Sequence, residues 1–298
     1  MASRETTTVG LGEVLWDILP AGKQLGGAPA NFAYISGLLG HHAVVASAVG
    51  ADALGAELRS RLAELKLDTS FVQVSEGHPT GKVNVILDHA GQPEYEIEQN
   101  VAWDFLAWTL PWQQLAARSA VICFGTLAQR SAASGTTIQS FLRTSRPDAI
   151  RIFDVNLRQH FFSADVLAES LRLANVAKLN DSELPVVMHY LDLTAGDQKS
   201  AAEGLRQKFG LDLVCVTRGS RGSLLVREGD SDEHPGFSVP VSDLVGAGDA
   251  FTAALAHHLL RDSSLREMNE AANRMGAWVA TQPGGTPPCD VDVIAQIV

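Results

Sequence analysis

Short apolar runs with strand-like composition alternate with helix-like stretches along most of this chain. The strand-like runs are residues 7–15, 43–49, 120–124, 149–154, 176–179 and 213–217. Residues 29–39, 54–65 and 164–174 instead show the three- and four-residue spacing of apolar side chains that is typical of helices. Apolar strands joined by helical crossovers form a mostly parallel sheet that helices cover on both faces. The sequence therefore predicts an α/β fold.

Residues 80–99 break this alternation. Two extended stretches, 81–88 and 93–98, are joined by residues 89–92, and apolar and polar side chains alternate in the first stretch. This pattern predicts an antiparallel hairpin. From the residues alone, a hairpin that only extends the edge of the sheet and a flap that covers a binding site are equally favoured. Because no long linker, repeat or low-complexity tract divides the chain, we expect residues 1–298 to form a single α/β domain with a small β-rich appendage.

Charge and hydropathy exclude several classes of protein. The formal net charge is −11, which argues against nonspecific nucleic-acid binding and against binding to anionic membranes. No apolar run reaches the roughly 18 residues of a membrane span, and the polar first eight residues do not resemble a signal peptide. The three cysteines include no CxxC pair and are expected to be reduced. We therefore expect a cytoplasmic protein.

The segment DLVGAGDAF, residues 243–251, has the composition of an anion site. It follows an apparently extended stretch, 237–241, and opens a long helical pattern. Gly246 and Gly248 allow a tight turn with outward N–H groups, and the free donors of a helix N-terminus add positive potential. Asp249 would lie on the first helical turn, where its carboxylate should be ionised. Its carboxylate either interacts favourably with the helix dipole and does no more, or acts as a general base beside the turn. This motif taken alone favours the interaction with the dipole.

Other polar residues lie where strands are expected to end. Asp17 follows the glycine-containing segment GLGE, and Asn31 lies in GGAPAN at the start of the next helix. Both residues suit the binding of hydroxyl groups, although a turn aspartate and an ordinary helix asparagine are the alternatives. With residues 154–158, 180–183 and 217–222 they should gather at the carboxyl ends of the strands, where α/β sheets bind ligands.

Several familiar sites are missing from the sequence. There is no P-loop motif GxxxxGK[ST] and no dinucleotide fingerprint GxGxxG near the start. The adjacent pairs at residues 41–42 and 257–258 are histidines, but neighbouring side chains diverge by about 100° on a helix. We therefore expect surface or packing histidines rather than metal ligands.

The motifs taken in order resemble the ribokinase/fructokinase superfamily, the PfkB-type carbohydrate kinases. The matching segments are GLGEVLWD, GGAPANFA, GADALGAEL, DVNLR, KLNDSEL, VTRGSRGS, DLVGAGDAF and QPGGTPP, which span nearly the whole chain. The resemblance implies transfer of a phosphoryl group from ATP to a sugar hydroxyl with the help of Mg²⁺. It also implies a ribokinase-like fold whose β-sheet lid is formed by segments near 13–25 and 80–105.

The resemblance also assigns catalytic and substrate roles. Asp249 would take the proton of the acceptor hydroxyl. The backbone amides of Gly246, Ala247 and Gly248 would stabilise charge on the transferring phosphoryl group, which is what this reaction chiefly requires. The sugar hydroxyls would be held by Asp17, Gly27 and Asn31, while Arg158 would face phosphate or substrate.

The nucleotide and ion sites follow from the same resemblance. Asn180 and Glu183 would serve the phosphates and Mg²⁺, with Glu183 reaching the ion through water. The residues bordering the nucleotide would be Thr217, Gly219 and Gly222, with Asn273 near the base. Asp243 and the carbonyl group of Val245 would match a monovalent-cation site for K⁺.

Two positions depart from the family pattern. Leu244 stands where the family usually has threonine, and the missing hydroxyl weakens the assignment of the K⁺ site. Gly285 replaces the commoner alanine in the closing segment, a change expected to matter little.

The sugar and the class of function leave alternatives. The opening segment and DVNLR resemble the fructokinase branch, so fructose is the first choice. A 2-keto-3-deoxygluconate kinase is the nearest rival, followed by tagatose-phosphate and nucleoside kinases. A non-catalytic sugar- or nucleotide-binding regulator is the alternative of a different class, and the intact Asp249 counts against it. The predicted lid could close over the sugar or pair with a second subunit in a homodimer.

Overall fold

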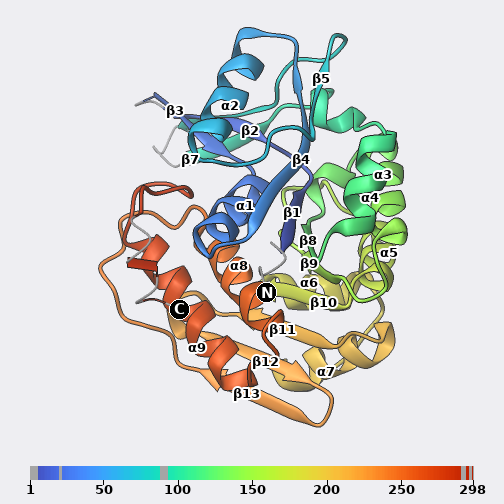
Figure 1. The fold of residues 1–298 in the computed structure, drawn as a ribbon. Coiled ribbons are helices and arrows are strands. Elements are labelled where there is room, and N and C mark those ends of the chain that lie inside the picture. The colour runs from blue at the N-terminus through green and yellow to red at the C-terminus, as the bar shows by residue number, and fades with distance from the viewer. Residues whose placement is uncertain (1–5, 20–21, 88–92, 290–292, 295–296, 298) are drawn as a thin grey trace, which may run out of the picture.

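Two β-sheets organise the computed structural model, which describes residues 6–19, 22–87, 93–289, 293–294 and 297 (Figure 1). Within these residues the large sheet has nine strands in the order β13-β12-β11-β10-β9-β8-β1-β4-β5. All neighbours are parallel except the antiparallel pairs β11–β12 and β12–β13. The strands are β1 Thr7–Leu11, β4 His42–Gly50, β5 Val72–Ser75, β8 Val121–Phe124, β9 Ile150–Asp154, β10 Val176–Asn180, β11 Leu213–Thr217, β12 Ser223–Arg227 and β13 Asp230–His234.

Helices cover both faces of the large sheet. One layer consists of α3 Leu110–Arg118, α4 Ala132–Thr144, α5 Ala164–Leu173, α6 Glu183–Tyr190 and α7 Gln198–Phe209. The other consists of α1 Ala28–Leu38, α2 Ala53–Glu64, α8 Ala247–Leu259 and α9 Leu265–Ala280. Strand side chains alternate between the layers, so Ile122 packs into the first core and Cys123 into the second. The predicted α/β fold with a mostly parallel sheet is confirmed.

The small sheet has the order β3-β2-β6-β7 and begins where β1 ends. Its strands are β2 Leu15–Leu19, β3 Gly22–Gly26, β6 Lys82–Leu87 and β7 Pro93–Ile97. The predicted hairpin is present as the antiparallel pair β6–β7, and its connection at 89–92 lies outside the described residues. The segments predicted as a lid, 13–25 and 80–105, thus supply all four strands. Three 3₁₀ turns complete the described elements: η1 Ala102–Phe105, η2 Leu127–Gln129 and η3 Gly219–Arg221.

Two predicted extended stretches were wrong in detail. The run 7–15 is not one strand, because the chain turns at Gly12, whose φ of 146° suits only glycine, and enters the small sheet as β2. Asp17 therefore lies in the middle of β2 and not at the end of a strand of the large sheet. Residues 237–241 form no strand, since Pro235 and Pro240 lack the N–H groups of a sheet ladder.

The parallel topology brings the ends of β1, β9, β10 and β11 to one edge of the large sheet. The N-termini of α1 and α8, which pack against each other, face the same region. None of the described helices has the length and apolarity needed to span a bilayer.

Candidate active site

Asp249 lies at the N-terminus of α8, behind a glycine turn. Gly246 precedes the helix with φ of 77°, and a Cβ atom there would lie only 2.4 Å from the Cα of Gly285. Only glycine fits this position. The first-turn N–H groups of a helix have no partners within the helix, so the turn is suited to an anion. The predicted placement of Asp249 on the first turn beside Gly246–Gly248 is confirmed.

Asn31 from α1 holds the Asp249 carboxylate. Its Nδ2 donates to Asp249 Oδ2 at 2.8 Å, although the two residues are 218 positions apart. The closing segment packs against the same amide, because a Cβ atom on Gly285 would lie 2.7 Å from the Asn31 amide atoms. The expectation that this second glycine matters little stays a prediction, which the contact with Asn31 puts in question. An alanine at position 285 would require the Asn31 amide group, which donates to Asp249, to shift.

Burial controls the protonation of Asp249. Desolvation, helped by the nearby Asp154 carboxylate, raises its pKa to about 6, while Asn31, Lys178 and Arg158 act in the opposite direction. The helix N-terminus was expected to keep the carboxylate ionised. It remains largely ionised at neutral pH, but burial outweighs the helix end. A carboxylate with this pKa is a better proton acceptor than an exposed aspartate.

A buried ion pair lies beneath the glycine turn. Lys178 Nζ donates to both carboxylate oxygens of Asp154 at 3.0 Å, and the Thr252 hydroxyl donates to Asp154 Oδ2 at 3.0 Å. A Cβ atom on Gly248 would lie 3.1 Å from Lys178 Nζ, so the ammonium group lies against the turn. Sequence reasoning did not single out Lys178. A lysine inside an otherwise apolar strand was the available clue.

The predicted sugar end is rich in carboxyl groups. Burial, helped by the negative charge of Asp243, raises the pKa of Asp17 to about 6, while the positive charge of Arg158 acts in the opposite direction. A Cβ atom on Gly26 would lie 2.3 Å from Asp17 Oδ2, so glycine leaves the space that this carboxylate occupies. Arg158 is exposed and lies within electrostatic reach of Asp17 and Asp249. Gly27, with φ of 107°, precedes α1 as its N-cap.

The predicted nucleotide end gathers loops that follow β10 and β11. Both oxygens of Glu183 accept backbone N–H groups, from Leu157 and from Asn180, each at 2.8 Å. Asn180 in turn accepts the amide of Glu183 at 2.8 Å. Thr217 ends β11, and the positive φ angles of Gly219 and Gly222 shape the turn that follows.

Asn273 is engaged with other side chains. Its Nδ2 donates to the Ser223 hydroxyl at 2.7 Å and to the Asn269 carbonyl at 2.8 Å, which joins α9 to β12. Its predicted place near the base of the nucleotide stays a prediction.

Asp243 bridges the glycine turn and the closing segment. Its carboxylate accepts the N–H groups of Val245 and Gly284, both at 3.0 Å. Leu244 beside it is 70% exposed and offers no oxygen. Across the described ranges, no group of three or more His, Cys, Asp or Glu side chains could hold a metal ion.

The histidine pairs do not form chelates within each pair. His41 Nε2 lies 3.0 Å from His257 Nδ1, between the end of α1 and α8. Burial lowers the pKa of His41 to about 4 and that of His257 to about 3, so both are neutral packing residues at neutral pH. The structure thus places His41 and His257 as packing residues.

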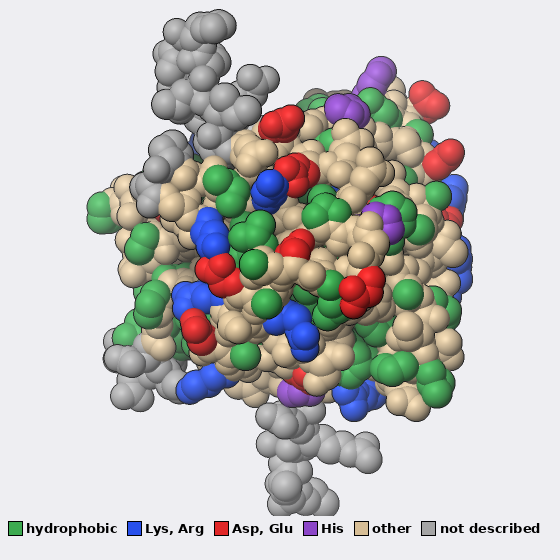
Figure 2. All heavy atoms as spheres, turned by 90° about the horizontal axis from the view of Figure 1, so that it is seen from above, with side chains coloured by type: hydrophobic (Ala, Val, Ile, Leu, Met, Phe, Trp, Pro, Cys, Tyr) green, Lys and Arg blue, Asp and Glu red, His purple; other side chains and the backbone are tan. Residues whose placement is uncertain are grey.

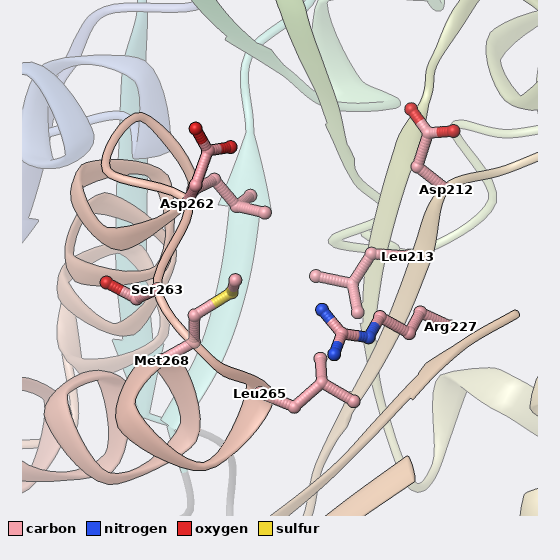
Figure 3. A pocket seen from close by; sticks show the side chains of 8 residues that line it. Asp212, Leu213, Arg227, Asp262, Ser263, Leu265 and Met268 are labelled. Carbon is pink, nitrogen blue, oxygen red and sulfur yellow. The ribbon is translucent and has the colours of Figure 1, made fainter. Parts of the chain in front are cut away.

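A pocket of about 250 Å³ lies at the opposite edge of the large sheet (Figure 3). It is formed where β11 begins, where β12 ends and where α8 meets α9. Leu213, Leu265 and Met268 form apolar walls, and Arg227 extends among them from β12 (Figure 3). None of the predicted site residues lines this pocket.

Comparison with known proteins identifies relatives over nearly the whole chain. The profile of the pfkB family carbohydrate kinase matches residues 20–291. A fructokinase of Salmonella typhimurium is 28% identical over 292 residues, which covers 92% of this chain and 93% of that protein. Among solved structures, a fructokinase from Xylella fastidiosa with bound ATP superposes with a TM-score of 0.84 at 22% identity, covering 98% of this chain and 97% of that one. A 2-dehydro-3-deoxygluconokinase from Thermotoga maritima superposes with a TM-score of 0.83 at 16% identity, covering 99% and 98%.

Proposed function

The chain belongs to the pfkB family of carbohydrate kinases, and we propose that it transfers the γ-phosphoryl group of ATP to a sugar hydroxyl. The observation that carries this proposal is Asp249, a buried carboxylate held by Asn31 at 2.8 Å beside a glycine turn suited to an anion. A base and a phosphate-binding turn at one place are what phosphoryl transfer to an alcohol requires.

In this proposal the sugar hydroxyl oxygen attacks the γ-phosphorus of ATP. The bond from that phosphorus to the bridging oxygen breaks, and ADP leaves with the electron pair. Asn31 holds Oδ2 of Asp249, and we assign Oδ1 to the hydroxyl proton. The amides of Gly246, Ala247 and Gly248 stabilise the charge on the moving phosphoryl group, and Lys178 beneath the turn adds positive potential.

We propose a neutral sugar, with fructose first. Asp17 and Asp249 place two carboxyl groups at the predicted sugar end, and Arg158 is a cation that acts on both of them. An acidic sugar such as 2-keto-3-deoxygluconate would add a third negative charge there, and like charges that lie close together are unfavourable. The fructokinase relative, at 28% identity, supports a sugar kinase of this family.

The ions and the small sheet complete the proposal. Both Glu183 oxygens accept backbone N–H groups, so we expect Glu183 to contact Mg²⁺ through a bound water. The Mg²⁺ would also bind the ATP phosphates and neutralise part of their charge. Asp243 with the Val245 carbonyl is the proposed place for K⁺. The small sheet serves as a lid over the sugar and belongs to the same single domain as the large sheet. Its edge strands are the proposed contact in a homodimer.

The decisive experiment is ADP release with ATP, Mg²⁺ and a panel of sugars, comparing fructose, glucose, ribose, 2-keto-3-deoxygluconate, tagatose 6-phosphate and adenosine. We expect turnover with fructose to exceed turnover with the other acceptors. Sugar-independent ATP binding without turnover would instead support the regulator. A different preferred sugar would keep the kinase and replace fructose.

Asp249→Asn supplies the test of the mechanism. Removal of a general base should lower kcat by about 10²–10⁴-fold while the protein stays folded and binds ATP. The matched control is Asp262→Asn, the same change at an exposed position after the far end of α8. If the Asp249 carboxylate only interacted favourably with the helix dipole, the Asp249→Asn variant would lose about 0.3–1 kcal/mol of stability and keep its turnover.

A further inference from the structure

Asp52 lies in the segment GADALGAEL, a motif that has no part in the proposed mechanism. It is the N-cap of α2, and its Oδ1 accepts the backbone N–H group of Gly55 at 2.7 Å. The same carboxylate accepts two hydrogen bonds from Thr80, which precedes β6 of the small sheet. The Thr80 N–H group donates to Oδ2 at 2.8 Å, and the Thr80 hydroxyl donates to Oδ1 at 2.6 Å. One side chain thus caps α2 and also holds the start of β6.

The two glycines of this motif leave the space that the connection needs. A Cβ atom on Gly50 would lie 2.6 Å from Asp52 Oδ2 and 2.7 Å from the Thr80 nitrogen. A Cβ atom on Gly55 would lie 2.7 Å from Thr80 Oγ1. The Thr80 hydroxyl also accepts the Gly50 N–H group at 3.0 Å, and Thr80 is 1% exposed. The motif therefore closes around Thr80, which a helix cap alone would not require.

The connection continues from Thr80 to Asp17. The carbonyl group of Gly81, the next residue, accepts the backbone N–H group of Trp16 in β2 at 3.1 Å. The Trp16 side chain is attached to α2 as well, because its Nε1 donates to the Leu54 carbonyl at 3.1 Å. Two routes thus run from the start of α2 to Trp16, and Asp17 is the next residue of β2.

We propose that Asp52 is a positioning residue, which holds Thr80 and thereby fixes β2 on α2 so that Asp17 faces the sugar. Asp52 itself does not touch the sugar in this proposal. The kinetic part of the proposal rests on the proposed kinase function. The attachment of β2 does not, because it is a property of the protein without substrates.

The bonds from Thr80 to Asp52 are the strong part of the attachment between α2 and the small sheet. Lys23 of β3 also forms an ion pair with Glu57 of α2, but these side chains are 33% and 50% exposed. Exposed ion pairs contribute little to stability. Hydrogen bonds to an ionised carboxylate are stronger than those between neutral groups. Loss of the Asp52 carboxylate should therefore loosen β2 more than loss of the exposed pair.

A serine at position 52 separates the cap from the attachment. Asp52→Ser keeps a good N-cap residue for α2, but its single oxygen cannot replace the two carboxylate oxygens that accept the Thr80 donors. The matched control is Asp197→Ser, because Asp197 caps α7 by accepting the Ser200 N–H group at 2.7 Å. Helix α7 covers the other face of the large sheet.

Two substitutions at position 80 isolate the hydroxyl group. Thr80→Val keeps the branched shape but can neither donate to Asp52 nor accept the Gly50 N–H group. Thr80→Ser keeps the hydroxyl and should restore the behaviour of the wild type. The loss in the valine variant and its recovery in the serine variant would assign the effect to the hydrogen bonds, since both variants change the packing of Thr80.

The attachment is tested by amide hydrogen exchange in the protein without substrates. We expect Asp52→Ser and Thr80→Val to speed exchange of the β2 amides roughly tenfold, the size of effect that a lost buried hydrogen bond produces. Thr80→Ser should stay near wild type, and Asp197→Ser should speed exchange only at the start of α7. Unchanged exchange of β2 in Asp52→Ser would overturn the attachment. If that variant does not fold, Thr80→Val, which removes one hydroxyl, decides in its place.

The action on Asp17 is tested by steady-state kinetics and a double-mutant cycle. Asp52→Ser should raise the KM for sugar about tenfold and change kcat less, while the KM for ATP stays near that of Asp197→Ser. Because Asp52 acts through Asp17, adding Asp52→Ser to Asp17→Ala should raise the KM for sugar no further. Additive losses, or equal rises for sugar and ATP, would overturn this action. A wild-type protein that phosphorylates no sugar would refute the proposed function instead, while the exchange data would still decide on the attachment.

Discussion

Burial shapes the chemistry of single residues at the sugar end. Desolvation raises the pKa of Asp17 and of Asp249 to about 6, well above that of an exposed aspartate. Both groups remain mostly ionised at neutral pH, yet each binds a proton more readily than usual. In the proposed reaction, Asp249 would gain basicity toward the hydroxyl proton, and Asp17 would be a strong acceptor for the hydroxyl groups of the sugar.

Asp17 tests the assignment of the sugar end. Asp17→Ala should raise the KM for sugar strongly and leave ATP binding nearly unchanged, since loss of a buried hydrogen-bond partner costs about 1–3 kcal/mol. Asp17→Asn, which keeps one acceptor oxygen, should fall between. Paired titrations of sugar and of ATP measure both effects. Equal loss for both ligands, or for neither, would count against the assignment.

At the scale of elements, Arg130 fastens the chain that leaves the small sheet. Its guanidinium donates to both oxygens of Asp104 in η1, at 2.8 and 2.9 Å, and to the Glu98 carbonyl just after β7. The Arg130 Cζ atom lies 4.0 Å from the centroid of the Trp103 ring and 4.7 Å from the centroid of the Phe161 ring. The two partners of this ion pair are 6% and 5% exposed. The root of the proposed lid is thus held to the large sheet by a desolvated ion pair.

Breaking this pair should strongly destabilise the fold. Arg130→Met leaves the Asp104 carboxylate buried without its cation, which typically costs about 3–5 kcal/mol. Adding Asp104→Asn removes that charge, and the double variant should recover part of the loss. Urea unfolding measures both, with Arg61→Met in the exposed Arg61–Glu64 pair as the control, for which we expect at most about 1 kcal/mol. A loss from Arg130→Met no larger than this control would refute the role.

At the scale of the whole molecule, the negative net charge bears on the choice of nucleotide complex. The chain carries −11, and on the face seen in Figure 2 acidic and basic side chains are interspersed. The candidate site contains Asp17, Glu183 and Asp249 among these acidic residues. Polyanionic ATP would therefore approach a negatively charged protein, a situation in which a bound divalent cation reduces the repulsion.

Chelation of divalent metal tests this dependence. Excess EDTA should abolish turnover, and added Mg²⁺ should restore it. The thermal midpoint should not move, since in the described parts of the chain no cluster of three or more ligating side chains ties a metal to the fold. Full turnover in excess EDTA would contradict the magnesium requirement. A large fall in the midpoint would reveal a structural metal.

The sequence by itself was sufficient for the local features. Apolar runs and helical spacing predicted most of the strands and the helices α1, α2, α5 and α8, because these patterns reflect which faces of an element are buried. Glycines before α1 and α8 marked both helix starts, since only glycine takes positive φ easily. The motif order indicated the family, and the profile match confirms it. Local composition misled only where prolines or a glycine interrupt an extended run, at 237–241 and at Gly12.

The tertiary structure alone decided which side chains meet. The hydrogen bond from Asn31 to Asp249 joins residues 218 positions apart. The ion pair between Lys178 and Asp154 links the neighbouring strands β10 and β9 beneath the glycine turn. The steric need for Gly285 appears only when the closing segment packs on Asn31. The raised pKa values of Glu13, Asp17 and Asp249 likewise depend on burial by elements far apart in sequence. Periodicity and propensity are short-range, whereas desolvation and contact geometry arise only once distant segments pack together.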